Sequence, residues 1–203
     1  MTDDRGDDGR GGTDLDALLT AYALKDETRT GWELRGVRDP ESVAAHSWGV
    51  ALLCLRYADA AGVDADLALR MAVVHDVGEA VVGDLPTRAD PAAETHDPEE
   101  KERLERAAVD DLAAGLGDEL RALWAAYEAR DSDVARFVKD MDLVDMCAQA
   151  VVYERERRYE EEGEAFDAYG RLDEFFATAE PRLSTDVGRR LFERLRARYE
   201  AVR

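Results

Sequence analysis

The chain is organised around one short stretch, His75-Asp76-Val77-Gly78-Glu79-Ala80-Val81-Val82-Gly83-Asp84-Leu85-Pro86-Thr87. An apolar run over residues 67–74 precedes it and predicts a helix that continues to about Ala80. On such a helix Glu79 shares a face with His75 and Asp76, because side chains three and four residues apart are neighbours. An imidazole and two carboxylates in one small volume are costly to bury unless a cation neutralises them. The stretch therefore predicts a metal site.

The length and composition suit one folded domain. The chain has 203 residues, of which 45% are hydrophobic, enough for a sizeable core. We expect a polar, disordered tail over residues 1–12 and a single domain over residues 13–203. No apolar run is long enough to cross a membrane, and the Asp- and Gly-rich start lacks the pattern of a signal peptide. Cys54 and Cys147 lie in apolar helical patterns and are expected to be buried thiols, which predicts a cytoplasmic location.

The charge of the chain limits its partners. The formal net charge is -20 at pH 7. Nucleic-acid polymers and anionic membranes bind to basic patches, so neither is expected as a partner. A small anionic substrate held by a metal ion and one or two arginines remains compatible with this charge.

Hydrophobic periodicity predicts an all-α fold, a single bundle of seven to eight helices. The expected helices cover residues 14–24, 39–61, 65–80, 97–116, 118–129, 132–159, 165–179 and 185–203. Cap-type residues such as Asp64, Asp97 and Ser132 stand at several of their starts. Leu15, Leu18, Leu19 and Tyr22 have the spacing of an apolar helix face, and Trp48 and Trp124 are expected in the core. No stretch shows the period-two alternation of a β-strand.

Two further positions extend the candidate metal site. His46 lies in an early predicted helix, and Asp142 borders the apolar face of a later one. Together with His75 and Asp76 they offer two imidazoles and two carboxylates from three separate segments. Such mixed N/O ligation suits a divalent ion such as Mn, Co, Fe, Ni or Zn. It also leaves coordination positions for water and substrate, as a catalytic site requires.

A second His-Asp pair, His96-Asp97, is interpreted differently. Pro98 and Glu100 follow it, and this combination is typical of a helix start at which Asp97 is the N-cap. We therefore exclude His96 from the site. On the helix that carries Asp142, Lys139 could pair with a site carboxylate, whereas Asp140 and Asp145 are expected to face solvent or to support the ligands.

These motifs, taken in order, resemble the HD-domain metal-dependent phosphohydrolases, and among them the 5'-deoxynucleotidase branch. The resemblance extends from about residue 15 to about residue 159. The motifs that carry it are Arg29-Thr30-Gly31-Trp32, Pro40-Glu41-Ser42-Val43, His46-Ser47, His75-Asp76-Val77-Gly78-Glu79, Val82-Gly83-Asp84-Leu85-Pro86-Thr87 and Lys139-Asp140-Met141-Asp142. One feature departs from the pattern: Thr30-Gly31 separates Arg29 from Trp32, whereas the two are adjacent in some bacterial members.

The resemblance implies hydrolysis of a deoxyribonucleoside 5'-monophosphate to nucleoside and phosphate by a homodimer. It implies a divalent cation, with Mg added to the ions named above. Some relatives place a second cation near Glu79 and Asp84, which the spacing here allows but does not demand, so one ion is the expectation. By the same resemblance, the metal ligands are His46, His75, Asp76 and Asp142. Glu79 would assist the attacking water, Asp84 would contact the sugar 3'-hydroxyl, and Arg29 and Trp32 would contact the substrate.

Plainer interpretations remain for single residues and for the whole site. Trp32 is equally expected in the core, Asp84 is a typical turn residue beside Gly83, and Arg29 could pair with a neighbouring acid. The alternative functions are an HD hydrolase of nucleotide di- or triphosphates and a non-catalytic module that senses a nucleotide or a metal. Analysis of the released product separates these functions.

Overall fold

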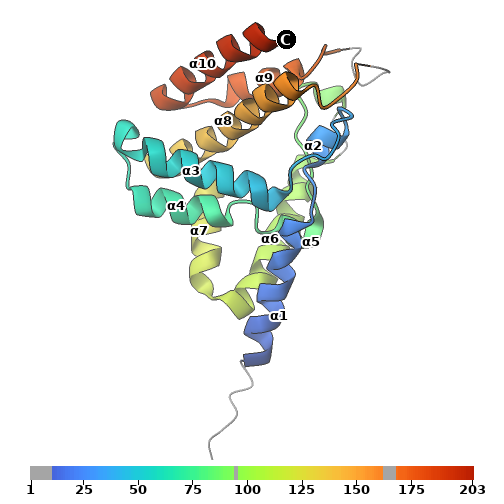
Figure 1. The fold of residues 1–203 in the computed structure, drawn as a ribbon. Helices are drawn as coiled ribbons and strands as arrows, with labels where there is room; N and C mark the ends of the chain where they lie inside the picture. Colours follow the sequence, from blue (N-terminus) through green and yellow to red (C-terminus); the bar gives the residue numbers. More distant parts are fainter. Residues whose placement is uncertain (1–10, 94–95, 162–167) are drawn as a thin grey trace, which may run out of the picture.

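The computed structural model describes residues 11–93, 96–161 and 168–203. All named elements in these ranges are helical, which confirms the all-α prediction (Figure 1). Eight α-helices have seven or more residues, and two have four. Their bounds are α1 Gly11–Ala21, α2 Thr30–Glu33, α3 Val43–Ala61, α4 Ala65–Val74, α5 Glu79–Val82, α6 Pro98–Leu116, α7 Asp118–Ala129, α8 Asp133–Glu156, α9 Asp173–Ala179 and α10 Asp186–Val202.

Side-chain caps mark the starts of five helices, four of them where a start was predicted, whereas the helix predicted from residue 39 begins only at Val43. The backbone N–H groups of Ala45, Leu67, Glu99, Ala135 and Gly188 donate to the side chains of Ser42, Asp64, Asp97, Ser132 and Thr185. Each cap satisfies one of the N–H groups that a helix start leaves without an intrahelical partner. At the other end of α3, Gly62 has φ +70°, a conformation that glycine adopts without strain.

Several predicted boundaries were wrong, and one of them affects the site. The helix predicted over residues 65–80 ends at Val74, and a turn over residues 75–78 separates it from α5. In this turn the N–H groups of Val77 and Glu79 donate to the carbonyls of Val74 and Asp76, three residues back. His75, Asp76 and Glu79 therefore do not share one regular helix face as predicted.

The remaining differences lie at element ends. The first predicted helix continues only as a 3₁₀ turn over Tyr22–Lys25, and the loop predicted over residues 25–40 contains α2. The helix predicted to reach residue 159 ends at Glu156, because Arg157 takes a left-handed conformation with φ 52°. The helix predicted over 165–179 is regular only in α9, and residues 165–167 lie outside the described ranges. Residues 1–10 of the expected tail also lie outside them, so the division into tail and domain stays a prediction.

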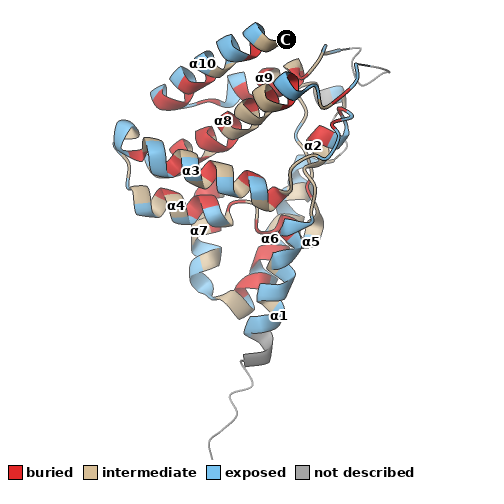
Figure 2. Cartoon of the chain, in the orientation of Figure 1, coloured by how far each residue is buried: buried red, intermediate tan, exposed pale blue. Residues whose placement is uncertain are grey.

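Helix α8 is the centre of the bundle. It packs against α3, α4, α7, α9 and α10 (Figure 1). Buried positions occur along most of its length in Figure 2. They include Phe137, Met141, Val144 and Cys147, which belong to the main hydrophobic core. Because α8 is surrounded by other elements, a polar side chain near its middle can meet partners from several of them.

Two helices carry apolar side chains on a face that this chain leaves open. Trp48 on α3 is 69% exposed, and Leu52 and Leu55, four and seven residues later, are exposed on the same face. The prediction that Trp48 lies in the core was wrong, because α3 turns Val50 and Cys54 inward instead. Trp124 is buried, as predicted. The apolar face predicted for α1, Leu15, Leu18, Leu19 and Tyr22, is exposed too. Within the described ranges, no helix has both the length and the apolarity needed to cross a bilayer.

Candidate metal centre

The four predicted ligands come together from three segments. His46 lies on α3, His75 and Asp76 lie in the turn after α4, and Asp142 lies on α8. Nε2 of His46 is 3.2 Å from Oδ1 of Asp142, 3.4 Å from Nε2 of His75 and 3.7 Å from Oδ2 of Asp76. Nε2 of His75 is 3.1 Å from the same Asp76 oxygen. Two imidazole nitrogens and an oxygen of Asp142 therefore lie around one point, and the Asp76 carboxylate borders this group.

Hydrogen bonds at the far nitrogens orient both imidazole rings. Nδ1 of His75 is 2.8 Å from the carbonyl oxygen of Ala72, and Nδ1 of His46 is 2.8 Å from Oδ2 of Asp145. With each Nδ1 as a donor, both Nε2 atoms direct their lone pairs toward the shared point. Second partners of this kind are typical of metal-binding histidines. The donor set fits a borderline or hard divalent cation.

The electrostatics of the site favour positive charge. Burial and Arg29 act to lower the pKa of His46, but hydrogen bonds to Asp142 and Asp145 outweigh them and raise it to about 10. Burial opposes ionisation of Asp76 and Asp142 as well. Nevertheless His75 and Arg29 hold the pKa of Asp76 well below its usual range, and Lys139 and His46 do the same for Asp142. The carboxylates are thus ionised where a cation would bind.

Asp142 is positioned by two residues besides the histidine. Its Oδ2 accepts hydrogen bonds from the hydroxyl of Tyr127, at 2.9 Å, and from Nζ of Lys139, at 2.7 Å. The predicted pairing of Lys139 with a site carboxylate is therefore observed. No motif in the sequence marks Tyr127 as a neighbour of the site.

Two other aspartates of α8, Asp145 and Asp140, have different partners. Asp145 supports His46, and a side chain on Gly49 would collide with its carboxylate. Asp140 is fully buried away from the site and accepts hydrogen bonds from Ser184 and Thr185 at the start of α10. Two groups of convergent potential ligands are found in the described ranges, His46 with His75 and Asp142, and Glu41 with His46 and Asp145. His96 belongs to neither, and Asp76 borders the first through its 3.1 Å approach to His75. Asp97 caps α6, as predicted.

Glu79 stands beside the ligands at the start of α5. Its side chain is 5% exposed, and among the described residues no hydrogen-bond partner reaches its buried Oε2. Burial, and then the negative charges of Asp76 and Asp84, raise its pKa well above the usual range of a glutamate. An unpaired buried carboxylate oxygen lowers the stability of the fold. Carboxylates with strongly shifted pKa values cluster at functional sites, so Glu79 is a candidate catalytic residue.

Asp84 connects the Gly-Asp-Leu-Pro corner to the loop that contains Arg29. Its Oδ2 accepts the N–H of Thr30 at 2.6 Å, and its carbonyl accepts the Thr30 hydroxyl at 2.9 Å. Arg29 itself donates through Nη1 to Oδ2 of Asp76, at 3.1 Å, so it pairs with a neighbouring acid. Thr30, one of the two residues between Arg29 and Trp32, therefore provides two of the contacts that hold Asp84, and Glu27 accepts the Asp84 N–H at 3.1 Å.

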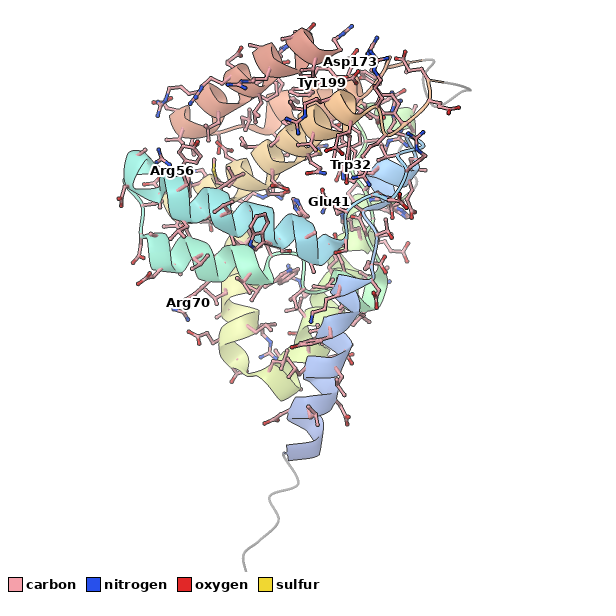
Figure 3. All side chains as sticks on the ribbon, in the orientation of Figure 1. Trp32, Glu41, Arg56, Arg70, Asp173 and Tyr199 are labelled. Carbon is pink, nitrogen blue, oxygen red and sulfur yellow. The ribbon has the colours of Figure 1, made fainter. Side chains whose placement is uncertain are left out.

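Trp32 lies mostly in the core. It is 2% exposed, it stacks on Phe175 with ring centroids 3.8 Å apart, and its Nε1 donates to Glu41 at 3.0 Å. Figure 3 shows the labelled Trp32 and Glu41 side by side near α2. An edge of the ring still borders the pocket described next, so contact with a substrate stays a prediction.

One pocket joins these residues, and we call it the main pocket. At one end lie the residues expected from the sequence, which are Arg29, Trp32, Asp76, Glu79, Asp84 and Asp142. The other walls include residues that sequence reasoning missed, among them Arg88, Lys101, Glu174, Phe175, Thr178 and Arg182. They come from α6, α9 and nearby loops, and no sequence motif links them to the histidines.

The geometry can be compared with known proteins. A profile described as HD domain matches residues 21–183. The chain belongs to the HD domain family. This membership confirms the resemblance inferred from the ordered motifs.

Relatives and a solved structure agree with this membership. The chain is 35% identical over 161 residues to 5'-deoxynucleotidase HDDC2 of Danio rerio, covering 77% of this chain and 73% of the relative. It is 33% identical over 157 residues to 5'-deoxynucleotidase hdd1 of Schizosaccharomyces pombe, covering 73% and 76%. The crystal structure of PH0347 protein from Pyrococcus horikoshii OT3 matches with a TM-score of 0.71 at 29% identity, over 92% of this chain and 98% of that one.

Proposed function

We propose that this HD domain protein is a metal-dependent 5'-deoxynucleotidase that releases phosphate from deoxyribonucleoside 5'-monophosphates. The observation that carries the proposal is the convergence of His46, His75, Asp76 and Asp142 beside the main pocket, which Asp76, Asp142, Glu79 and Asp84 line. The two relatives described above are both named 5'-deoxynucleotidase, which supports the same substrate class.

A divalent cation is the cofactor of this proposal. His46, His75, Asp76 and Asp142 would hold it, and Mn, Co, Fe, Ni, Zn and Mg are the candidates to be tested. When bound, such an ion polarises phosphoryl oxygens and lowers the pKa of a water from about 15.7 toward about 7. A second cation near Glu79 and Asp84 belongs to the proposal as well, supported by the proximity of these two carboxylates in the main pocket.

The remaining roles follow from the contacts of each side chain. Oε2 of Glu79 has no other partner among the described residues, so it is available to accept a proton from the attacking water. Arg29 lies beside Asp76 in the main pocket, where its guanidinium can donate to phosphate oxygens. Asp84 would accept the sugar 3'-hydroxyl, and Trp32 would border the nucleoside.

The sugar contact gives the deoxy preference a physical basis. Thr30 holds both the carboxylate and the carbonyl of Asp84, so the Gly-Asp-Leu-Pro corner is braced against the Arg29 loop. A rigid carboxylate close to the 3'-hydroxyl would leave little room for a 2'-hydroxyl. The preference for deoxyribose therefore depends on Asp84 keeping its place.

Phosphate release tests the proposal directly. Protein stripped with a chelator and reloaded with Mn or Co is supplied with dAMP, AMP and p-nitrophenyl phosphate, and phosphate is measured. We expect metal-dependent release that is fastest with dAMP. Release of pyrophosphate or triphosphate from nucleotide di- or triphosphates would instead assign the chain to the HD hydrolases that act on those nucleotides. Tight nucleotide binding without any turnover would assign it to a sensing module.

We also propose that the chain forms a homodimer and acts in the cytoplasm. The exposed apolar side chains of Trp48, Leu52 and Leu55 on α3 support a contact with another chain, because large exposed apolar patches commonly mark interfaces. The two cysteines, Cys54 and Cys147, are free and buried, which fits a reducing compartment. Light scattering on wild type and on Leu52→Asp tests the dimer, which the substitution is expected to dissociate.

A further inference from the structure

A lysine of α6 lies where two pockets meet. Lys101 lines the main pocket and also a second pocket, which is bordered by Gly78, Glu102, Glu105, Trp124 and Glu128 among others. The two pockets share Asp76, Glu79, Thr87 and Lys139 as lining residues. The metal ligand Asp76 and the proposed base Glu79 are therefore approached from two sides, and Lys101 stands at the junction.

Lys101 makes its hydrogen bond and its ion pair with residues that are not proposed metal ligands. Its ammonium donates to the carbonyl oxygen of Leu85, the residue after Asp84, and Nζ is 3.6 Å from Oε1 of Glu105. The first partner is neutral, and the second is too distant for a hydrogen bond. An ammonium carries three N–H donors, so these contacts leave capacity for a further acceptor.

The other two cations beside the ligands are engaged differently. Arg29 donates to Asp76, and Lys139 donates to Asp142, so each balances the charge of a proposed metal ligand. Lys101 lies among the carboxylates of Glu105, Glu79, Asp76 and Asp84. Burial acts to lower its pKa, but these carboxylates outweigh burial and raise it, so the side chain is charged. A phosphate monoester is dianionic near neutral pH and needs such a cation next to the reacting group.

We propose that Lys101 binds the phosphate group of the substrate at the junction of the two pockets. The proposal rests on the proposed nucleotidase function and adds a substrate-contacting residue to it. Lys101 holds a phosphate oxygen on the α6 side of the site, across from the loop that carries Arg29. The contact with Leu85 fixes the ammonium, so the donor is already oriented when substrate arrives.

A purely structural role makes a different prediction. If Lys101 only tethered Leu85, its loss would displace the adjacent Asp84 and weaken the sugar contact as much as the phosphate contact. The two products of the reaction separate these roles, because inorganic phosphate reports on one contact and deoxyadenosine on the other. Competitive inhibition by each product is therefore measured against dAMP in metal-loaded wild type, Lys101→Met and Lys101→Arg.

The proposal expects a selective effect. In Lys101→Met the inhibition constant of inorganic phosphate and the KM for dAMP rise by about 10–100-fold, the range for a lost hydrogen bond to a charged group. The inhibition constant of deoxyadenosine stays within about twofold. Lys101→Arg keeps most of the phosphate affinity because it keeps the charge. Glu105→Gln is the matched control: it removes the charged neighbour of Lys101 and leaves the ammonium, so phosphate affinity is retained.

Two outcomes would overturn the proposal. Equal weakening of phosphate and deoxyadenosine in Lys101→Met would show a tether, and no change in either would show that the lysine does not touch substrate. If wild type releases no phosphate, the proposed function has failed. The contact between Lys101 and phosphate is then tested by calorimetric titration of inorganic phosphate into metal-loaded wild type and Lys101→Met. Equal phosphate affinity of the two proteins would refute the contact.

Discussion

Asp140 and Asp142 lie two residues apart on α8, and the structure buries both, yet their surroundings differ. Asp140 accepts hydrogen bonds from the backbone N–H and hydroxyl groups of Ser184 and Thr185, all of them neutral donors at the start of α10. Asp142 faces the imidazole of His46, the hydroxyl of Tyr127 and the ammonium of Lys139. One carboxylate joins two helices, and the other belongs to a cluster of ionisable groups.

The comparison shows that burial alone does not identify a functional carboxylate. The partners of Asp140 satisfy its oxygens completely, and Gly188 is required beside it because any side chain there would overlap the carboxylate. The groups around Asp142 leave two imidazole nitrogens 3.4 Å apart and a further carboxylate on Asp76. Such a set is stable only with positive charge at its centre. On α8, neutral hydrogen-bond donors therefore indicate a structural carboxylate, and ionisable partners indicate a carboxylate of the proposed metal site.

The largest expected effect comes from removing a ligand. His75→Ala should lose its metal ion and all measurable phosphate release, since second partners of metal ligands alone are worth about 10–100-fold in metal affinity. Elemental analysis and the phosphate assay check this. His96→Ala is the matched control, because it removes a histidine outside the cluster, and it should behave as wild type. A His75→Ala protein with normal metal content would show that the centre lies elsewhere.

The next effect separates chemistry from metal binding within the same pocket. Glu79→Gln should lower kcat by about 10²–10⁴-fold, the usual contribution of a positioned acid or base, while metal content is retained. The reason is that Gln fits the same space but cannot accept a proton. Elemental analysis and initial rates on the same sample are the measurement. Loss of both metal and activity would instead make Glu79 a ligand.

The sequence predicted this site far better than it predicted its surroundings. The ligands belong to motifs whose order and residue types are recognisable, and helix caps such as Asp64 and Ser132 are local signals that the structure confirms. The break after Val74 was missed because no proline or glycine stands between residues 74 and 77 to signal the end of a helix. Tyr127 and Lys101 were missed because a single residue brought in from another helix has no spacing to reveal it.

The exposed apolar face of α3 marks another limit of sequence patterns. Periodicity shows that a face is apolar but not what covers it. Trp48, Leu52 and Leu55 repeat with helical spacing just as Val50 and Cys54 do, and only the latter pair faces the core of this chain. Trp32 shows the converse, since a motif residue expected at the substrate also packs against Phe175.

The structural carboxylate should matter for stability and not for metal binding. Asp140→Asn would place an amide against the donors of Ser184 and Thr185 and should destabilise the fold by about 2–4 kcal/mol, as losses in buried networks do. Denaturant unfolding measures this, and elemental analysis of the folded protein should find the normal metal content. A variant with normal stability would mean that the buried network at the start of α10 contributes little.

The smallest effect has the opposite sign and completes the comparison. The folded state raises the pKa of Glu79, so its ionised form destabilises the fold. This penalty is absent below the unfolded pKa of about 4.3 and develops as the pH rises through that value toward the folded pKa. In the presence of a chelator, Glu79→Gln should therefore match wild type near pH 4 and exceed its stability by about 1–2 kcal/mol at neutral pH. Unfolding curves across this range check the trend, and a variant that is less stable at pH 7 would contradict it. If an amide destabilises the fold at position 140 and stabilises it at position 79, the two carboxylates differ in role. Asp140 then stabilises the structure, whereas Glu79 is retained for the reaction although it lowers stability.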